Sequence, residues 1–210
     1  MDRVRLFGSG RRASVAFVLV VLFLDTLGVG VIVPVSPRLI ASLSTGTFEE
    51  ASRQYGAFIA IYAAMQVLFA PVLGALSDRF GRRAVILGSL LGSTLDYCLC
   101  AVAPSLGWLF FGRVVAGITG ANFSAATAYI ADVTPEHERA ERFGLIGAAI
   151  GMGFILGPAI GGLIGGVHLR FPFVVAAILN GINFAYGLFV LPESLTKQHR
   201  RPFSLVRANP

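Results

Sequence analysis

Residues 74–83 read GALSDRFGRR, a short segment with one acidic and three basic residues between two long apolar stretches. An α-helix needs about 20 apolar residues to cross the hydrocarbon core of a membrane. A charged segment between two stretches of that length is typical of a tight turn between two membrane-spanning helices. The segment therefore predicts an integral membrane protein.

Composition extends this prediction to the whole chain. Apolar residues make up 55% and charged residues 13% of the sequence, and the mean hydropathy is +0.76, unlike the balance of a soluble domain. We expect an all-α membrane protein: an N-terminal arm (1–12), a transmembrane domain (13–191) and the start of a linker (192–210). The domain would hold six spans, at Ala13–Pro34, Tyr55–Leu76, Ala84–Ala103, Leu106–Ala131, Phe143–Gly166 and Phe171–Leu191.

The basic residues predict the orientation. Of the 17 Lys and Arg residues, most lie in the N-terminal arm, in the loops after the second and fourth spans, and in the tail. Cytoplasmic loops carry an excess of Lys and Arg, so both termini are expected in the cytoplasm. Contact with anionic lipid headgroups explains the net charge of +6, and no nucleic-acid partner is expected.

Three charged side chains lie within the predicted spans: Asp25, Asp96 and Arg113. Such a group costs several kcal/mol in lipid unless it faces a cavity or a partner. Asp25 and Asp96 each follow the cytoplasmic end of their span by about 12 residues, which places both about 18 Å deep. Two carboxyls at one depth suit proton or cation carriage, with Arg113 as a neighbouring cation. The alternative is that each forms a buried hydrogen bond or snorkels to an interface.

Uncharged residues add further candidates. Gln66 and Asn122 carry amides that both donate and accept hydrogen bonds, and they either line a substrate path or join neighbouring helices. In the fifth span, glycines recur nearly every four residues, a spacing that lets helices approach closely, and Pro158 favours a bend. These features indicate either close packing alone or a moving or leak-tight helix. The recurring glycines are Gly147, Gly151, Gly157, Gly161 and Gly165, and Gly162 follows directly after Gly161.

Three motifs, in order, resemble those of the major facilitator superfamily. GALSDRFGRR resembles its loop 2–3 signature, and GRVVAGITG (112–120) resembles its helix 4 motif. GMGFILGPAIGG (151–162) resembles the helix 5 motif of drug/proton antiporters. LDTLGVGVIVPVSPRL (24–39) and MQVLFAP (65–71) are similar to the tetracycline/proton antiporter branch. The resemblance covers essentially the whole chain.

This resemblance implies a transporter of a bacterial inner membrane that exports a tetracycline-like drug in exchange for protons. The drug would travel as a complex with a divalent cation such as Mg²⁺, and no cofactor beyond the proton gradient is implied. Asp25 and Asp96 would couple protons to the drug complex, and Gln66 would belong to the substrate path. A cytoplasmic gate would form from Gly74, Asp78, Arg79, Gly81, Arg82, Arg83 and Asp132.

The resemblance also sets the expected partners. Members of the superfamily have twelve helices in two halves, each a 3+3 inverted repeat, so six spans and a linker-like tail indicate the first half. The expected partners are the drug, the lipid bilayer, and either the second half or a second copy of this chain, which would complete the cavity. An exporter of another drug, a sugar or a metabolite is one alternative, and a non-transporting membrane interaction subunit is another. No metal-spaced cluster or nucleophile motif occurs, so no metal site and no enzyme is expected.

Overall fold

The structure, a computed structural model, describes residues 3–120 and 122–195, with side chains from residue 15 onward. The described residues form helices and no β-strand. The tail residues 196–210 and the first two residues of the predicted arm lie outside the described part. The helices are α1 (Arg3–Ile32), α2 (Ser36–Leu43), α3 (Phe48–Phe80), α4 (Arg82–Val102), α5 (Leu106–Thr119), α6 (Asn122–Val133), the 3-10 helix η1 (Glu136–Glu138), α7 (Arg139–Val167) and α8 (Phe171–Val190).

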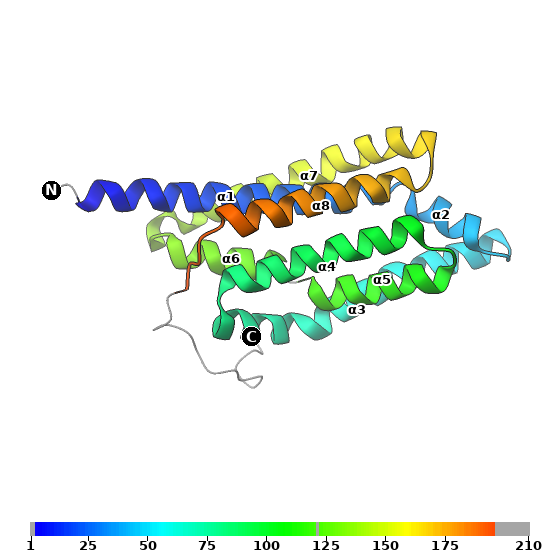
Figure 1. Cartoon of the computed structure of the whole chain (residues 1–210), viewed down its shortest axis with the longest axis horizontal. Helices are drawn as coiled ribbons and strands as arrows, with labels where there is room; N and C mark the ends of the chain where they lie inside the picture. Colours follow the sequence, from blue (N-terminus) through cyan, green and yellow to red (C-terminus); the bar gives the residue numbers. More distant parts are fainter. Residues whose placement is uncertain (1–2, 121, 196–210) are drawn as a thin grey trace.

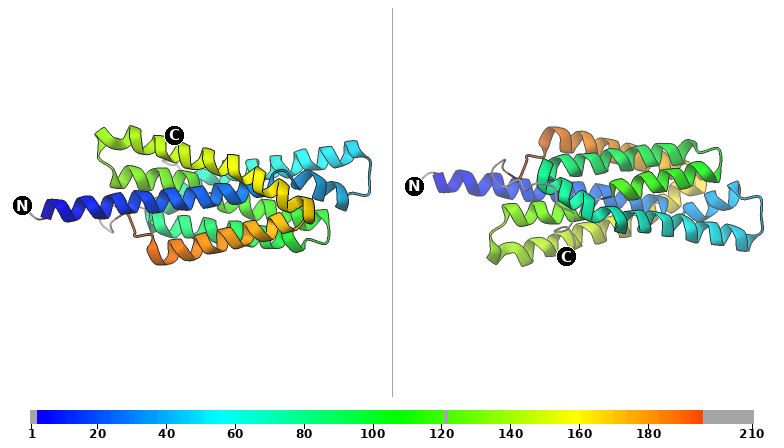
Figure 2. Two further views of the ribbon diagram at one scale, coloured as in Figure 1. Left: turned by 90° about the horizontal axis from the view of Figure 1, so that it is seen from above. Right: turned by 90° about the horizontal axis from the view of Figure 1, so that it is seen from below.

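The long helices lie side by side along one axis (Figures 1 and 2). The α3–α4 turn, the α6–α7 turn and the end of α8 lie at the end of the bundle where α1 begins, and α2 lies at the opposite end with the α4–α5 and α7–α8 turns. Within the described residues, six candidate spans are long and apolar enough to cross a membrane, with α5 and α6 together forming the fourth. The six predicted spans are thus confirmed.

The helices extend beyond the apolar windows. α1 begins at Arg3, so most of the predicted arm is helical. α3 begins at Phe48, where the Thr47 hydroxyl accepts a hydrogen bond from the Glu50 backbone N–H (3.4 Å). Glu49 and Glu50 in its first turn suit the positive end of the helix dipole. An apolar window marks only the part of a helix that lies in lipid, so the sequence did not predict where these helices begin. The short helix α2 was not predicted either.

The fourth span is broken, whereas the sequence predicts one continuous helix. α5 ends at Thr119 and α6 begins at Asn122. Gly120 between them has a non-helical ψ of 56°, and its carbonyl accepts a hydrogen bond from Gln66 Nε2 on α3 (3.2 Å). A break inside a membrane is tolerated where other groups satisfy the freed backbone. Here the Gln66 amide of α3 supplies such a group, because it donates to the Gly120 carbonyl at the break.

The core lies around α1 and α4. α1 packs on α7 and α8, α4 packs on α5 and α8, and α3 packs mainly on α5. One apolar cluster lies toward the start of α1 and includes Val18, Ile86 and Tyr129. A second lies toward α2 and includes Leu39 and Phe173. The charged residues of the spans lie along the helices between these two clusters.

Candidate functional site

Asp96 on α4 and Arg113 on α5 form a buried ion pair. Their relative exposures are 0% and 6%, and Arg113 Nη2 contacts Asp96 Oδ2. Gly112 leaves room for the carboxylate, because a Cβ at this position would lie 2.5 Å from Asp96 Oδ1. Cys100 Sγ donates a hydrogen bond to that same oxygen (3.4 Å). Two of the three charges within the predicted spans therefore neutralise each other.

Three aromatic rings surround the Arg113 guanidinium. Its Cζ lies 5.1 Å from the ring centroid of Phe58, 5.4 Å from that of Tyr62 and 5.8 Å from that of Tyr97. Cations are attracted to ring faces within about 6 Å, so the rings replace part of the water that the arginine loses. Aromatic side chains are common in membrane helices, so no distinct signal in the sequence indicates that these three rings surround Arg113.

Asp25 on α1 belongs to the same region. Tyr62 lies within electrostatic range of both Asp25 and Arg113, and the Asn122 side chain forms a hydrogen bond with Asp25. Asp25 Oδ1 is shielded from solvent without a hydrogen-bond partner. In the described part of the chain, Asp25 has no ion-pair partner. We call Asp25, Tyr62, Asp96, Arg113 and Asn122 the intramembrane cluster, in which Arg113 pairs with Asp96 and not with Asp25.

Gln66 reaches this cluster indirectly. Its Nε2 donates to the Tyr62 hydroxyl (3.1 Å) as well as to the Gly120 carbonyl (3.2 Å). α3 comes close to the broken span here, since a Cβ at Gly117 would lie 2.5 Å from Met65 Cβ. Gln66 therefore joins two helices and orients a tyrosine of the cluster. Helix joining by Gln66 thus has a structural basis, and its place in a substrate path stays a prediction.

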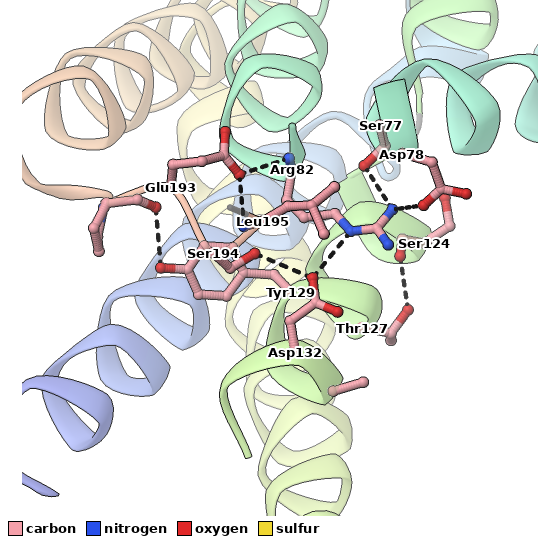
Figure 3. Close-up of polar contacts among 12 residues, drawn as sticks. Ser77, Asp78, Arg82, Ser124, Thr127, Tyr129, Asp132, Glu193, Ser194 and Leu195 are labelled. Carbon is pink, nitrogen blue, oxygen red and sulfur yellow. Dashed lines mark hydrogen bonds and ion pairs between the residues drawn. The ribbon is translucent and has the colours of Figure 1, made fainter. Parts of the chain in front are cut away.

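A second polar group lies at the end of the bundle where α1 begins. Arg82 at the start of α4 contacts Asp78 Oδ1 through Nη1 (2.6 Å) and Asp132 Oδ2 through Nε (3.2 Å). Its Nη1 also donates to Ser77 Oγ (3.1 Å), as Figure 3 shows. The arginine fork suits two carboxylates at once. We call Ser77, Asp78, Arg82 and Asp132 the loop cluster; it joins the ends of three spans.

The remaining predicted gate residues lie outside the loop cluster. Arg79 packs over the Phe80 ring, with Cζ 5.2 Å from its centroid. Arg83 donates to the Leu188 carbonyl of α8. A Cβ on Gly74 would have no neighbour within 4 Å. Gly81 forms the turn itself, with φ of 109°, in the left-handed region that favours glycine. Of the predicted gate residues, Asp78, Arg82 and Asp132 lie together in the loop cluster and Gly81 forms the adjacent turn; the gating role of all of them stays a prediction.

The glycines of α7 form a different stripe from the predicted one. A Cβ on Gly157 would lie 2.6 Å from Gly30 Cα, and a Cβ on Gly161 would approach the Val31 backbone of α1 even more closely. Both are buried with Gly153 and Gly165, so the packed stripe runs 153, 157, 161 and 165. The predicted close approach is wrong for Gly147 and Gly151, where a Cβ would have no neighbour within 4 Å, and Gly162 beside the stripe has none either.

The physical reason is the helix period. Residues 151 and 157 are six apart and lie on different faces at 3.6 residues per turn, whereas 153 and 157 share a face. Pro158 lies inside α7, which continues to Val167.

Two buried amides on α8 were missed. Asn180 and Asn183 are each 0% exposed, and Asn183 Nδ2 donates to the Val21 carbonyl (2.8 Å). Val21 lies one turn before Asp25 on α1, so this bond fixes α1 to α8 close to Asp25. The sequence signal was the amide pair in LNGIN (179–183), which a search limited to charged residues passes over.

Several known proteins are similar to this chain in sequence or in fold. The Major Facilitator Superfamily profile matches residues 13–208. The tetracycline resistance protein of class C from Escherichia coli is 50% identical over 187 residues, covering 89% of this chain and 46% of that protein. Multidrug resistance protein 2 of Bacillus subtilis is 35% identical, covering 87% and 45%. The crystal structure of a human organic anion transporter aligns with a TM-score of 0.82 at 27% identity, covering 93% of this chain and 50% of that one.

These comparisons agree with the six candidate spans. The chain spans about half the length of the curated relatives it matches. Its helices correspond to one six-span half of a transporter fold. The chain belongs to the major facilitator superfamily, as a multi-pass membrane protein similar to the tetracycline resistance proteins.

Proposed function

We propose that this chain forms the N-terminal half of a proton-coupled exporter of tetracycline-class drugs. The observation that carries the proposal is the Asp25 carboxyl, which has no ion-pair partner among the described residues, in the same cluster as the neutralised Asp96–Arg113 pair. The chain is also 50% identical to a tetracycline resistance protein. The second half of the transporter, or a second copy of this chain, would complete the substrate cavity. The protein would lie in a bacterial cytoplasmic membrane with both termini in the cytoplasm.

The intramembrane cluster supports an exchange at one carboxylate. A proton and a cationic drug complex cannot both neutralise the Asp25 charge, so binding of one favours release of the other. A tetracycline that carries a divalent cation such as Mg²⁺ would supply that positive charge as part of the substrate. Asn122 would hold the carboxylate in place, and the Asp96–Arg113 pair would leave Asp25 as the charge that changes.

The loop cluster would close the cytoplasmic side of the transporter. Its arginine joins α4 to the ends of α3 and α6, and its side chain is only 13% exposed. An ion-paired arginine in such a position holds three helix ends in one arrangement. Separation of these ends would then open the inner side.

Replacing Arg82 with alanine should favour the inward-open arrangement, because Asp78 and Asp132 lose the cation that joins them. A cysteine introduced at Thr127 on α6 would report the change through its rate of thiol labelling from the cytoplasmic side. We expect labelling about tenfold faster in Arg82→Ala, as for loss of a charge-assisted hydrogen bond. The labelling rate of Arg82→Lys should lie between the rates of the parent and of Arg82→Ala. An unchanged rate would contradict the gating role.

The multidrug relatives favour a second candidate cargo. Two Bacillus subtilis multidrug resistance proteins are each 35% identical to this chain, so other drugs, hydrophobic cations among them, are the second candidate. Accumulation assays with tetracycline and with hydrophobic cationic dyes, in cells that hold both halves of the transporter, separate the two. Exclusion of tetracycline alone supports our proposal, and exclusion of the dyes alone supports the second candidate.

A further inference from the structure

We infer that Glu193 and Ser194 position the loop cluster, by fastening the segment Pro192–Leu195 after α8 to the start of α4 and to Asp132 (Figure 3). Pro192–Leu195 is the described beginning of the segment that the sequence predicts to be a linker. The inference rests on the proposed gating role of the loop cluster. It adds a fourth chain segment to the three helix ends already joined there.

Glu193 caps α4 from a distance of 111 residues along the chain. Its Oε1 accepts from the Arg82 backbone N–H (2.9 Å) and from the Leu195 N–H (3.1 Å). The first N–H groups of a helix lack partners within that helix, and the N-cap residue Gly81 has no side chain to supply one. A carboxylate is also favoured there by the helix dipole. Glu193 therefore takes over the role of a local capping side chain.

Gly81 makes this contact possible. A Cβ on Gly81 would lie 2.6 Å from Glu193 Cδ, so a larger residue would displace the carboxylate. The backbone of Arg82 is then held by Glu193, while its side chain is held by Asp78 and Asp132. One residue thus links the segment after α8 to the loop cluster.

Ser194 acts at the other side of the cluster. Its Oγ donates to Asp132 Oδ2 (3.2 Å), the same oxygen that Arg82 Nε contacts (3.2 Å). One turn earlier on α6, the Tyr129 hydroxyl donates to the Pro192 carbonyl (3.1 Å), as Figure 3 shows. A movement that separates Arg82 from Asp132 must therefore break these bonds or carry Pro192–Leu195 with it. The segment after α8 would move when the loop cluster opens.

Thiol labelling of the chain itself in lipid nanodiscs tests this inference. A Leu195→Cys reporter in a Cys98→Ala background should label about fivefold faster in Glu193→Ala and in Ser194→Ala, the factor for loss of a bond worth about 1 kcal/mol. Ser194→Thr keeps the hydroxyl and should keep the parent rate, as should Ser105→Ala at the opposite end of the bundle. Cys100, which is fully buried, should stay unlabelled and so shows that each variant is folded.

A double-mutant cycle makes the test specific. Each of Arg82→Ala and Ser194→Ala should increase the labelling rate of the Leu195→Cys reporter. In the double variant the increase should be smaller than the product of the two single increases, because both changes remove a contact to Asp132 Oδ2. Multiplicative effects, or unchanged rates in Glu193→Ala and Ser194→Ala, would overturn the inference. Labelling needs neither drug nor second half. If the cycle shows coupling while Arg82→Ala leaves the Thr127→Cys rate unchanged, the gating proposal fails and the fastening of Pro192–Leu195 stands.

Discussion

Asp25→Asn should abolish proton-driven drug export and leave the protein folded, when the chain is produced together with the second half of a tetracycline resistance protein. Asn keeps the shape of the side chain and its hydrogen bond with Asn122, but it neither binds a proton nor attracts a cationic complex. Because Asp25 has no ion-pair partner among the described residues, no charge is stranded. We expect export to fall to the background of cells without the transporter, at an unchanged level of protein in the membrane.

Asp96→Asn should behave differently. It leaves the Arg113 guanidinium buried without its carboxylate, and breaking a buried ion pair from one side costs about 3–5 kcal/mol. We therefore expect a lower midpoint of thermal unfolding in detergent as well as lost export. Combining Asp96→Asn with Arg113→Gln removes both charges and should recover much of the stability but not the export.

The contrast between the two variants separates the roles of the carboxyls. Equal thermal stability of Asp96→Asn and the parent would show that the ion pair is dispensable for folding. Export that persists in Asp25→Asn would remove Asp25 from the coupling step, and the proposed exchange with it.

Gly157→Leu should disrupt the packing of α7 on α1. Even a Cβ at this position would lie 2.6 Å from Gly30 Cα and 3.0 Å from the Leu27 carbonyl oxygen. These are backbone atoms, which cannot turn aside as a side chain can. Overpacking of a core costs about 1–3 kcal/mol where side chains can adjust, so we expect a loss at or above the upper end of that range. The midpoint of thermal unfolding and the yield of membrane-inserted protein measure it.

The same helix provides matched controls. Gly162→Leu makes the same chemical change where a Cβ would have no neighbour within 4 Å, and Ile155→Leu alters a side chain that is 74% exposed. Both should retain the parent's unfolding midpoint. If Gly162→Leu is as harmful as Gly157→Leu, the effect arises from helix propensity or lipid contact rather than from the approach of α1.

Sequence patterns predicted the six spans well because span length and apolar composition are local properties. They also singled out Asp25, Asp96 and Arg113, since a charge in lipid needs a compensating environment wherever the chain folds. They could not show that Arg113 pairs with Asp96 rather than with Asp25. That choice depends on which faces of α1, α4 and α5 meet, and this is a tertiary property.

Other features depend on three-dimensional placement in the same way. The aromatic rings around Arg113 come from two helices, and Glu193 caps a helix that begins 111 residues earlier. The break at Gly120 had a local signal in the glycines of GITG (117–120), but the Gln66 donor that satisfies it comes from α3. The glycine stripe was visible in sequence, yet its packed face was assigned wrongly because glycines occur on several faces of α7.

The central claim is that this chain supplies the proton-coupled half of a tetracycline exporter, and uptake of tetracycline with Mg²⁺ by everted membrane vesicles tests it most directly. Vesicles that contain this chain and the second half of the class C relative should take up the drug when a proton gradient is imposed. Uptake should stop when the gradient is dissipated or when Asp25 is replaced by Asn, and vesicles with either half alone should show none. Uptake no greater than that of the second half alone, or equal uptake by the Asp25→Asn variant, would contradict the account.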